Sequence, residues 1–221
     1  GLLDAVSQGD YETCEEVMVH IDERYHPRRP ADRFVDPQTG DTPLVFAIQN
    51  GHREVVDLLI DYGANVNHKW SPLVDEFSLS NIQPLHLAII ALNKSQGETE
   101  REDVDKKQHR QDIVLKLINA GADVNALSAK GTPLMLALNG NCVPREDWDF
   151  LYELAQILLD HGADPNRMGK QPTNCSHPLN GACFMAYFGT EENRLEIVYK
   201  MLECGADPGM YAPGGGGQVS P

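Results

Sequence analysis

The sequence has 221 residues, and 41 % of them are hydrophobic, which is enough to bury a sizeable core. Its 33 acidic and 18 basic residues give a formal net charge of −15, which excludes general binding to nucleic acid because phosphate groups are repelled. The charge either favours basic or apolar protein partners or only keeps the chain soluble. No apolar run approaches the roughly 18 residues that cross a bilayer, and five scattered cysteines argue for an intracellular protein, cytoplasmic or nuclear, without a disulfide framework.

The first part of the chain predicts an incomplete pair of helices. Residues 2–10 indicate the end of a short helix and a turn. A second helix is expected from Tyr11 to about Glu23, because its apolar residues keep the spacing i, i+3, i+4, i+7: they are Cys14, Val17, Met18 and Ile21. This segment lacks a glycine at its end. The basic, proline-rich residues 25–30 that follow form either an extended connection or a small anion-binding patch.

Two signals then recur four times in the same order. The first places proline where a helix tolerates it best, in the first turn: Thr42-Pro43-Leu44, Gln83-Pro84-Leu85, Thr132-Pro133-Leu134 and His177-Pro178-Leu179. The second is an apolar helical stripe that ends in a glycine suited to a left-handed turn: Gly63, Gly121, Gly162 and Gly205. Each copy therefore predicts a turn, a short helix, a second helix and another turn.

Residues 37–67 carry the fullest copy of this unit. It contains Thr42-Pro43-Leu44, Ala47-Ile48, Gly51-His52, Glu54-Val55-Val56, Leu58-Leu59 and Gly63-Ala64-Asn65-Val66-Asn67, and it closely resembles the ankyrin repeat. The resemblance implies an all-α ankyrin-repeat solenoid of stacked helix-turn-helix units with projecting finger loops. We expect this domain at residues 1–208, with repeats at about 1–30, 37–67, 78–125, 127–166 and 172–208 and with the first and last repeats as caps.

Insertions distinguish the later repeats from the second one. Residues 68–80 form a lengthened finger with several apolar side chains, which either anchor a partner or fold back over the neighbouring short helix. Residues 93–111 are polar, and their C-terminal part is expected to extend the next helix outward. Residues 144–161 predict one long helix, in which Trp148 either packs on the stack or stays partly exposed. Asn180-Gly181 is expected to break the last short helix, and residues 209–221 predict a flexible glycine-rich tail or linker.

No chemical site is expected. Cys175, His177, Cys183 and Cys204 are the only local cluster of thiols and imidazoles, but it contains no Cys-x-x-Cys pair, so we predict no metal and no cofactor. A Cys–His nucleophilic pair would lack an orienting partner, and the resemblance to ankyrin repeats implies that the chain is not an enzyme. The resemblance implies a structural hydrogen-bonding role for His86 and likens Asn125 to an asparagine that is hydroxylated in some ankyrin proteins. The Asp and Asn residues of the repeated Gly-Ala-Asp/Asn segments are expected to set the local turn.

The resemblance further implies a protein-interaction module, scaffold or adaptor that binds a protein or extended peptide as a monomer. Its binding positions would lie on the exposed side of the short helices, at Gln49, Asn50, Ile90, Ala91, Asn139, Gly140, Phe184 and Met185. Others would lie on the fingers, at Gln38, Thr39, Lys69, Trp70, Phe77, Ser128, Lys130 and Lys170. Two alternatives stay open: a recognition domain of a larger enzyme or effector with catalysis elsewhere, and a small-ligand or metal pocket built by the insertions.

Overall fold

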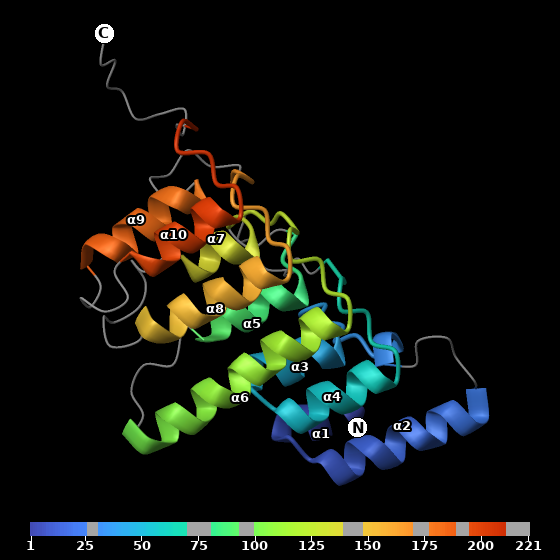
Figure 1. The fold of residues 1–221 in the computed structure, drawn as a ribbon. Helices are drawn as coiled ribbons and strands as arrows, with labels where there is room; N and C mark the ends of the chain where they lie inside the picture. Colours follow the sequence, from blue (N-terminus) through green and yellow to red (C-terminus); the bar gives the residue numbers. More distant parts are fainter. Residues whose placement is uncertain are drawn as a thin grey trace, which may run out of the picture. The chain divides into compact units, whose positions relative to one another are not determined.

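The computed structural model describes residues 1–25, 31–69, 81–92, 100–138, 148–169, 177–188 and 195–210. Within these ranges the chain forms ten α helices and a 3₁₀ helix (Figure 1). They are α1 (Leu2–Gln8), α2 (Tyr11–Tyr25), η1 (Ala31–Arg33), α3 (Pro43–Asn50), α4 (Arg53–Asp61), α5 (Pro84–Leu92), α6 (Glu100–Asn119), α7 (Pro133–Ala137), α8 (Trp148–Asp160), α9 (Pro178–Phe188) and α10 (Glu196–Glu203). Each odd-numbered α helix contacts the even-numbered one after it, so the helices form five pairs, one for each expected repeat.

The chain divides into two compact units, Gly1–Asp123 and Val124–Pro221. In the first unit the short helices α1, α3 and α5 contact one another in order, and the second helices α2, α4 and α6 do the same (Figure 1). Side chains between these two layers are fully buried: they include Leu44, Ile48, Leu59, Leu85, Ile89, Ile113 and Leu117. Because removal of apolar surface from water is the main favourable contribution to folding, this buried layer holds the helix pairs together.

The second unit repeats the arrangement with two helix pairs. Helix α7 contacts α9, and α8 contacts α10. The apolar stripe that the sequence predicted for the second helix of the fourth repeat is buried, and so are two leucines of the short-helix segment: Leu151, Leu154, Leu158, Leu134 and Leu138 are at most 1 % exposed. Each unit is therefore two layers of helices around one apolar core.

The expected starts of the short helices are confirmed. Pro43, Pro84, Pro133 and Pro178 are the first residues of α3, α5, α7 and α9. At two of these starts a threonine caps the helix: the hydroxyl oxygen of Thr42 accepts a bond from Val45 N at 3.4 Å, and that of Thr132 accepts one from Met135 N at 3.3 Å. Such caps satisfy a backbone N–H that would otherwise lack a partner.

The expected glycine stops are confirmed as well. Gly63, Gly121, Gly162 and Gly205 have φ angles of 78°, 89°, 85° and 89°, in the left-handed region that a side chain disfavours. The residue after each glycine donates its N–H to a carbonyl of the last helical turn, as Ala64 does to Leu59 at 2.9 Å. The turn therefore leaves the helix in the same way in four repeats.

The longer second helices agree with the sequence prediction. Helix α6 has 20 residues, whereas α4 has 9, so the C-terminal part of residues 93–111 does extend the helix. Helix α8 runs through Trp148–Asp160, which confirms the described part of the long helix expected at 144–161.

The expectation that Asn180-Gly181 breaks the last short helix is wrong. Helix α9 is continuous from Pro178 to Phe188. A Cβ atom at Gly181 would lie 2.9 Å from the carbonyl oxygen of Leu138 and 3.0 Å from its Cβ. Glycine is required here because α9 passes very close to the residue that follows α7, and this close packing offsets the cost of glycine inside a helix, about 1 kcal/mol.

Several predictions fall outside the described residues. They concern the connection at 26–30, the finger residues 70–80, the insertion at 139–147, Lys170, Cys175 and the tail at 211–221. The extent of the repeat domain, 1–208, also stays a prediction. Among the described helices, none combines the length and the apolar character needed to span a membrane.

Candidate interaction surface

Three asparagines join the turns of successive repeats. The side-chain nitrogens of Asn67, Asn125 and Asn166 donate to the carbonyls of Gly121, Gly162 and Gly205, at 2.9, 2.9 and 2.8 Å. Their side-chain oxygens accept from the backbone N–H groups of Asp123, Asp164 and Asp207, at 2.8, 2.7 and 2.8 Å. We call this set the asparagine ladder. Each amide satisfies two backbone groups of the next repeat, so the ladder fixes the spacing of neighbouring turns.

Only the local part of this bonding was predicted from the sequence. Asp164 Oδ1 accepts from Asn166 N at 2.8 Å, and Asp207 Oδ1 accepts from Gly209 N at 2.7 Å, which confirms that these residues set their own turns. The bonds between repeats were missed. The recurrence of Asn at the fifth position of the Gly-Ala-Asp/Asn segment, in three of its four copies, was the available signal.

The described finger turns are held by side-chain bonds beneath exposed tips. Asp36 Oδ1 accepts from the N–H groups of Gln38 and Thr39, at 2.7 and 3.1 Å, while the Gln38 side chain is exposed. In the fourth repeat Ser128 Oγ donates to the carbonyl of Gly131 at 2.8 Å and accepts from Lys130 N at 3.2 Å. Because Ser128 is buried while Lys130 is exposed, the turn can present a cationic side chain from a fixed backbone, although Ser128 itself cannot contact a partner.

The ends of the short helices differ from one repeat to the next. Gln49 and Asn50 at the end of α3 are exposed, as predicted, and Ile90 near the end of α5 is half-buried. Ala91, expected to be exposed, is 8 % exposed and therefore buried. The reason is the extension of α6, since its Arg110 donates a bond from Nη1 to the carbonyl oxygen of Ala91.

Arg110 also reaches the end of α3. A Cβ atom at Gly51 would lie 3.6 Å from Arg110 Nε, so this half-buried guanidinium lies by the C-terminal ends of two short helices. A cation is favourable there because the carbonyl end of a helix carries a partial negative charge. No pattern in the sequence indicated this role, because Arg110 lies in the polar segment 93–111, where no contact with the short helices was expected.

In the fifth repeat, Phe184 on α9 is half-buried, and the side chain of Met185 lies outside the described residues. Nearby on the same helix, Tyr187 is 74 % exposed, although sequence reasoning did not select it. Lys69, at the edge of the described part of the lengthened finger, is exposed, and Trp70, Phe77, Asn139 and Gly140 lie outside the described residues.

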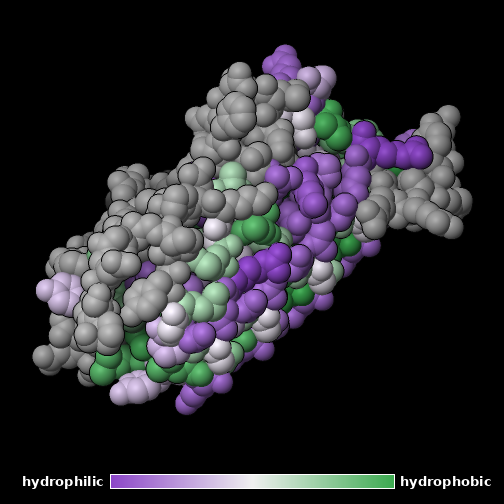
Figure 2. Space-filling model, turned by 90° about the horizontal axis from the view of Figure 1, so that it is seen from above, coloured by the Kyte–Doolittle hydropathy of each residue, from purple (hydrophilic) through white to green (hydrophobic). Residues whose placement is uncertain are grey.

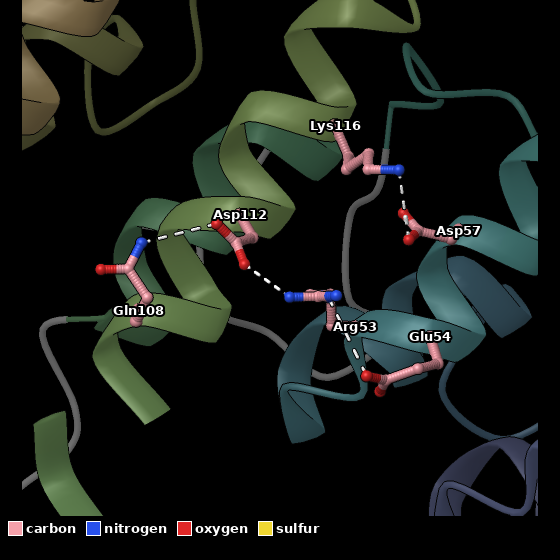
Figure 3. A network of polar contacts seen from close by, with 6 residues as sticks. All are labelled: Arg53, Glu54, Asp57, Gln108, Asp112 and Lys116. Atoms are coloured by element: carbon pink, nitrogen blue, oxygen red, sulfur yellow. Dashed lines mark hydrogen bonds and ion pairs between the residues drawn. The ribbon is translucent and has the colours of Figure 1, made fainter. Parts of the chain in front are cut away.

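The second helices carry a polar network on their margins. Figure 3 shows Arg53 of α4 directed at Asp112 of α6, with Nη1 and Oδ2 2.7 Å apart, and Lys116 directed at Asp57, with Nζ and Oδ2 3.3 Å apart. Arg53 Nε also lies 3.9 Å from Glu54, and Gln108 donates to Asp112 at 3.5 Å. These charges are partnered between adjacent repeats, so their role is to align α4 with α6.

Two histidines and one cysteine are buried within the described helices and turns. Both His86 and His177 are buried, and their Nδ1 atoms accept from Gln83 N at 3.3 Å and from Leu179 N at 3.2 Å; the expected structural role of His86 is confirmed. Burial lowers the pKa of His177 and raises the pKa of the Cys14 thiol to about 11. Within the described residues, no group of three Cys, His, Asp or Glu side chains could hold a metal ion.

Polar and apolar side chains are interspersed on the surface that Figure 2 shows, with hydrophilic residues (purple) running between hydrophobic ones (green). Among the described residues, the large apolar side chains that are exposed are Tyr11, Val19, Val35, Tyr187, Leu195, Tyr199, Leu202 and Met210. Four of these eight belong to the fifth repeat, and Met210 follows it directly. The described surface is therefore most apolar at its C-terminal end.

Helix pairs stacked through a shared apolar core and joined by bridged turns define a helical repeat protein. The chain belongs to the ankyrin-repeat family: the model "Ankyrin repeats (3 copies)" matches residues 2–96 and the model "Ankyrin repeat" matches residues 131–170, together more than half of the chain. Members of this family are generally protein-protein interaction modules.

A curated relative is the Ankyrin repeat and KH domain-containing protein mask-1 of Caenorhabditis elegans, with 30 % identity over 177 residues. The match covers 78 % of this chain but only 6 % of that protein. The chain is therefore similar to a small part of a much longer protein.

Proposed function

We propose that this chain is a non-catalytic interaction module that binds a protein or an extended peptide through its finger tips and the exposed side of its short helices. The observation that supports this most is the combination of fixed turns and exposed tips. The asparagine ladder spaces the turns that follow the second helices through bonds of 2.7 to 2.9 Å, and Gln38, Lys69 and Lys130 are exposed on the finger segments. A preorganised surface of this kind lowers the entropic cost of binding.

The proposed contacts mix polar and apolar side chains. On the described helices they are Gln49, Asn50, Ile90 and Phe184, with Lys69 on the finger, and they continue outside the described residues at Trp70, Phe77 and Asn139 and with the side chain of Met185. Aromatic side chains dominate the energy of many interfaces, so Trp70 and Phe77 are the proposed anchors. Because the net charge is −15, the partner we propose is a basic or apolar segment rather than nucleic acid. We also propose an intracellular monomer without a cofactor.

The test is affinity capture from a lysate of the cells that express the chain. The wild type is compared with a finger variant, Trp70→Ala with Phe77→Ala, and a short-helix variant, Gln49→Ala with Asn50→Ala. A matched control changes the same side-chain types on a second helix, Gln108→Ala with Asn119→Ala, since both are exposed on α6. All four proteins should unfold at similar temperatures before they are compared.

The proposal predicts one partner that is captured by the wild type and the control and is lost from both the finger and the short-helix variants. Direct titration of that purified partner should give a Kd at least about tenfold weaker for each variant. Capture that is unchanged in both variants, or lost equally in the α6 control, would contradict the proposed surface.

A second proposal is that the chain serves as the recognition part of a larger enzyme or effector. It is favoured by the match to mask-1, in which the similar region is 6 % of the length. An antibody against this chain would then detect a cellular protein much heavier than 24.5 kDa that carries a catalytic domain. Detection only of a species near 24.5 kDa would contradict it.

A further inference from the structure

Helix α10 exposes a stripe of apolar side chains. Leu195, Tyr199 and Leu202 are 56 %, 60 % and 40 % exposed, and their spacing of i, i+4 and i+7 places them on one side of the helix. The residues that hold the same places relative to the glycine stop in repeats two to four are all buried or half-buried: Arg53, Asp57 and Ile60; Gln111, Leu115 and Ile118; Tyr152, Gln156 and Leu159. We call Leu195, Tyr199 and Leu202 the α10 stripe.

In each unit these places contact the second helix of the following repeat. Arg53 bonds to Asp112 at 2.7 Å and Asp57 pairs with Lys116 at 3.3 Å across α4 and α6. Tyr152 of α8 donates from its hydroxyl to Glu196 of α10 at 2.5 Å. The α10 stripe therefore corresponds to the side of α4 and of α8 that receives another helix. Leu195 and Tyr199 stand where those helices have Arg53 and Asp57 or Tyr152 and Gln156, and Leu202 stands where they have the apolar Ile60 and Leu159.

At the C-terminal end of the repeats, two other features that join neighbouring repeats are missing: the ladder asparagine and the buried face of the short helix. The ladder asparagine is replaced by Gly209, which has no side chain to bridge to a further turn. On α9, Asn180 is exposed where the earlier short helices bury Val45, His86 and Met135, and Cys183 is exposed where they bury Ile48, Ile89 and Leu138. A further ankyrin repeat would therefore lack the ladder bonds to its turn and the buried contacts to its short helix. A single helix that packs on α10 needs neither.

We propose that the α10 stripe is a second docking site, distinct from the finger and short-helix surface, and that its occupant is a basic amphipathic helix of a partner protein. The apolar face of this helix covers Leu195, Tyr199 and Leu202. Its cationic margin meets Glu203, which is exposed and holds the place that Asp160 holds in the fourth repeat, where Lys200 lies 2.6 Å from Asp160. The proposed helix would therefore contact α10 in the way that α10 contacts α8.

Charge decides between this occupant and a second copy of the chain. Two copies joined through their α10 stripes would each bring a net charge of −15 and would each place an exposed Glu203 at the margin of the interface. Like charges in an interface are costly. A basic helix is instead attracted by the same negative charge, so the stripe selects against self-association and for a cationic partner.

The experiment titrates the full chain into a fluorescent synthetic peptide of about 20 residues that has leucines on one helical face and lysines on the margins, and it measures anisotropy. Replacing the stripe, Leu195→Ser with Tyr199→Ser and Leu202→Ser, should weaken binding at least about tenfold. The control Val35→Ser removes an apolar residue that is 46 % exposed just before the second repeat and should leave binding unchanged.

Two matched charge reversals distinguish binding of the peptide at the α10 stripe from general electrostatic attraction between the peptide and the acidic chain. Glu203→Lys and Glu16→Lys change the net charge equally, and both glutamates are exposed, but Glu16 lies on α2 in the first repeat. Glu203→Lys should weaken binding at least about threefold more than Glu16→Lys. Equal losses from the two reversals, or unchanged binding to a folded stripe variant, would overturn the proposal. Dimerisation of the wild type that the stripe variant abolishes would also overturn it.

Discussion

The interface between α4 and α6 and the interface between α8 and α10 occupy equivalent positions in the two units but use different chemistry. In the first, Arg53 and Lys116 form ion pairs with Asp112 and Asp57 (Figure 3). In the second, a tyrosine hydroxyl bonds to Glu196, and an ion pair joins Lys200 to Asp160. The buried leucines and the ladder amides are common to both. The buried apolar positions and the turns therefore define the repeat, while the side chains at the edges of the second helices vary without changing it.

A similar contrast separates the short-helix layers. Helix α3 packs on α5 with ordinary side chains, whereas α9 approaches the end of α7 so closely that Gly181 touches Leu138. Replacing Gly181 with Ala should therefore cost about 2 kcal/mol of unfolding free energy, because the new Cβ would lie 2.9 Å from a backbone oxygen. Urea titration followed by circular dichroism measures the loss.

The control for that substitution is Gly162→Ala. No atom lies within 4 Å of a Cβ at Gly162, but its φ angle is 85°, so only the backbone strain of about 1 kcal/mol applies. A smaller loss for Gly181→Ala than for Gly162→Ala would show that α9 is not held against Leu138.

The asparagine ladder should make equal contributions in the two units. Asn67→Ala and Asn166→Ala each remove two hydrogen bonds between turns, and each should lower the unfolding free energy by about 1 kcal/mol. Denaturant unfolding of the two variants gives the comparison. Asn119→Ala, an exposed asparagine outside the ladder, should change stability by less than about 0.5 kcal/mol; a loss as large as those of the ladder variants would contradict the assignment.

The start of α9, which carries His177, should make the free energy of unfolding depend on pH. The starts of α3 and α7 carry threonine and should not. Burial lowers the pKa of His177 below its ordinary value of 6.5, with a smaller opposing effect of Asp207. The unfolded chain therefore takes up a proton that the folded chain resists, and stability falls as the pH drops through about 6.5.

His177→Thr installs the cap that Thr42 and Thr132 provide. The variant should lose less stability than the wild type between pH 7.5 and pH 5, by a difference of about 1 kcal/mol or less. Thermal melts at the two pH values measure it. An identical pH dependence in both proteins would mean that His177 does not titrate on unfolding.

The smallest expected effects belong to the ion pairs. A double-mutant cycle with Arg53→Ala and Asp112→Ala should give a coupling of about 0.5 to 1 kcal/mol, because these side chains are only 37 % and 29 % exposed. The same cycle for Lys200 and Asp160 should give about 0.3 kcal/mol, since Asp160 is 58 % exposed. Both couplings should fall in high salt. A larger coupling for the Lys200 pair would contradict the assigned order.

Local signals in the sequence were sufficient for the helix pairs. The prolines that begin α3, α5, α7 and α9 and the four glycine stops are determined by single residues and their backbone geometry, so they could be placed without a structure. What could not be predicted depends on distant neighbours. The helical Gly181 needs Leu138, the burial of Ala91 needs Arg110, and the ladder amides need the turns of the following repeats.

For the candidate site, too, local position in the sequence predicted some exposures, while others depend on neighbouring helices. Exposure of Gln49 and Asn50 follows from their position at the end of α3 and was predicted correctly. The exposure of the α10 stripe was missed because Leu202 belongs to the apolar pattern of a second helix, and Leu195 and Tyr199 lie outside that pattern. An apolar pattern alone does not tell whether a neighbouring helix covers the residue.

We expect the turns and the ends of the short helices, rather than the second helices, to receive the partner captured from the lysate. Hydrogen-deuterium exchange of the chain with and without this partner tests that expectation. Exchange should slow at the finger turn of residues 36–41, at residues 65–69 and at the end of α3, with α4 and the described part of α6 unchanged. Protection confined to α4 and α6 would contradict it.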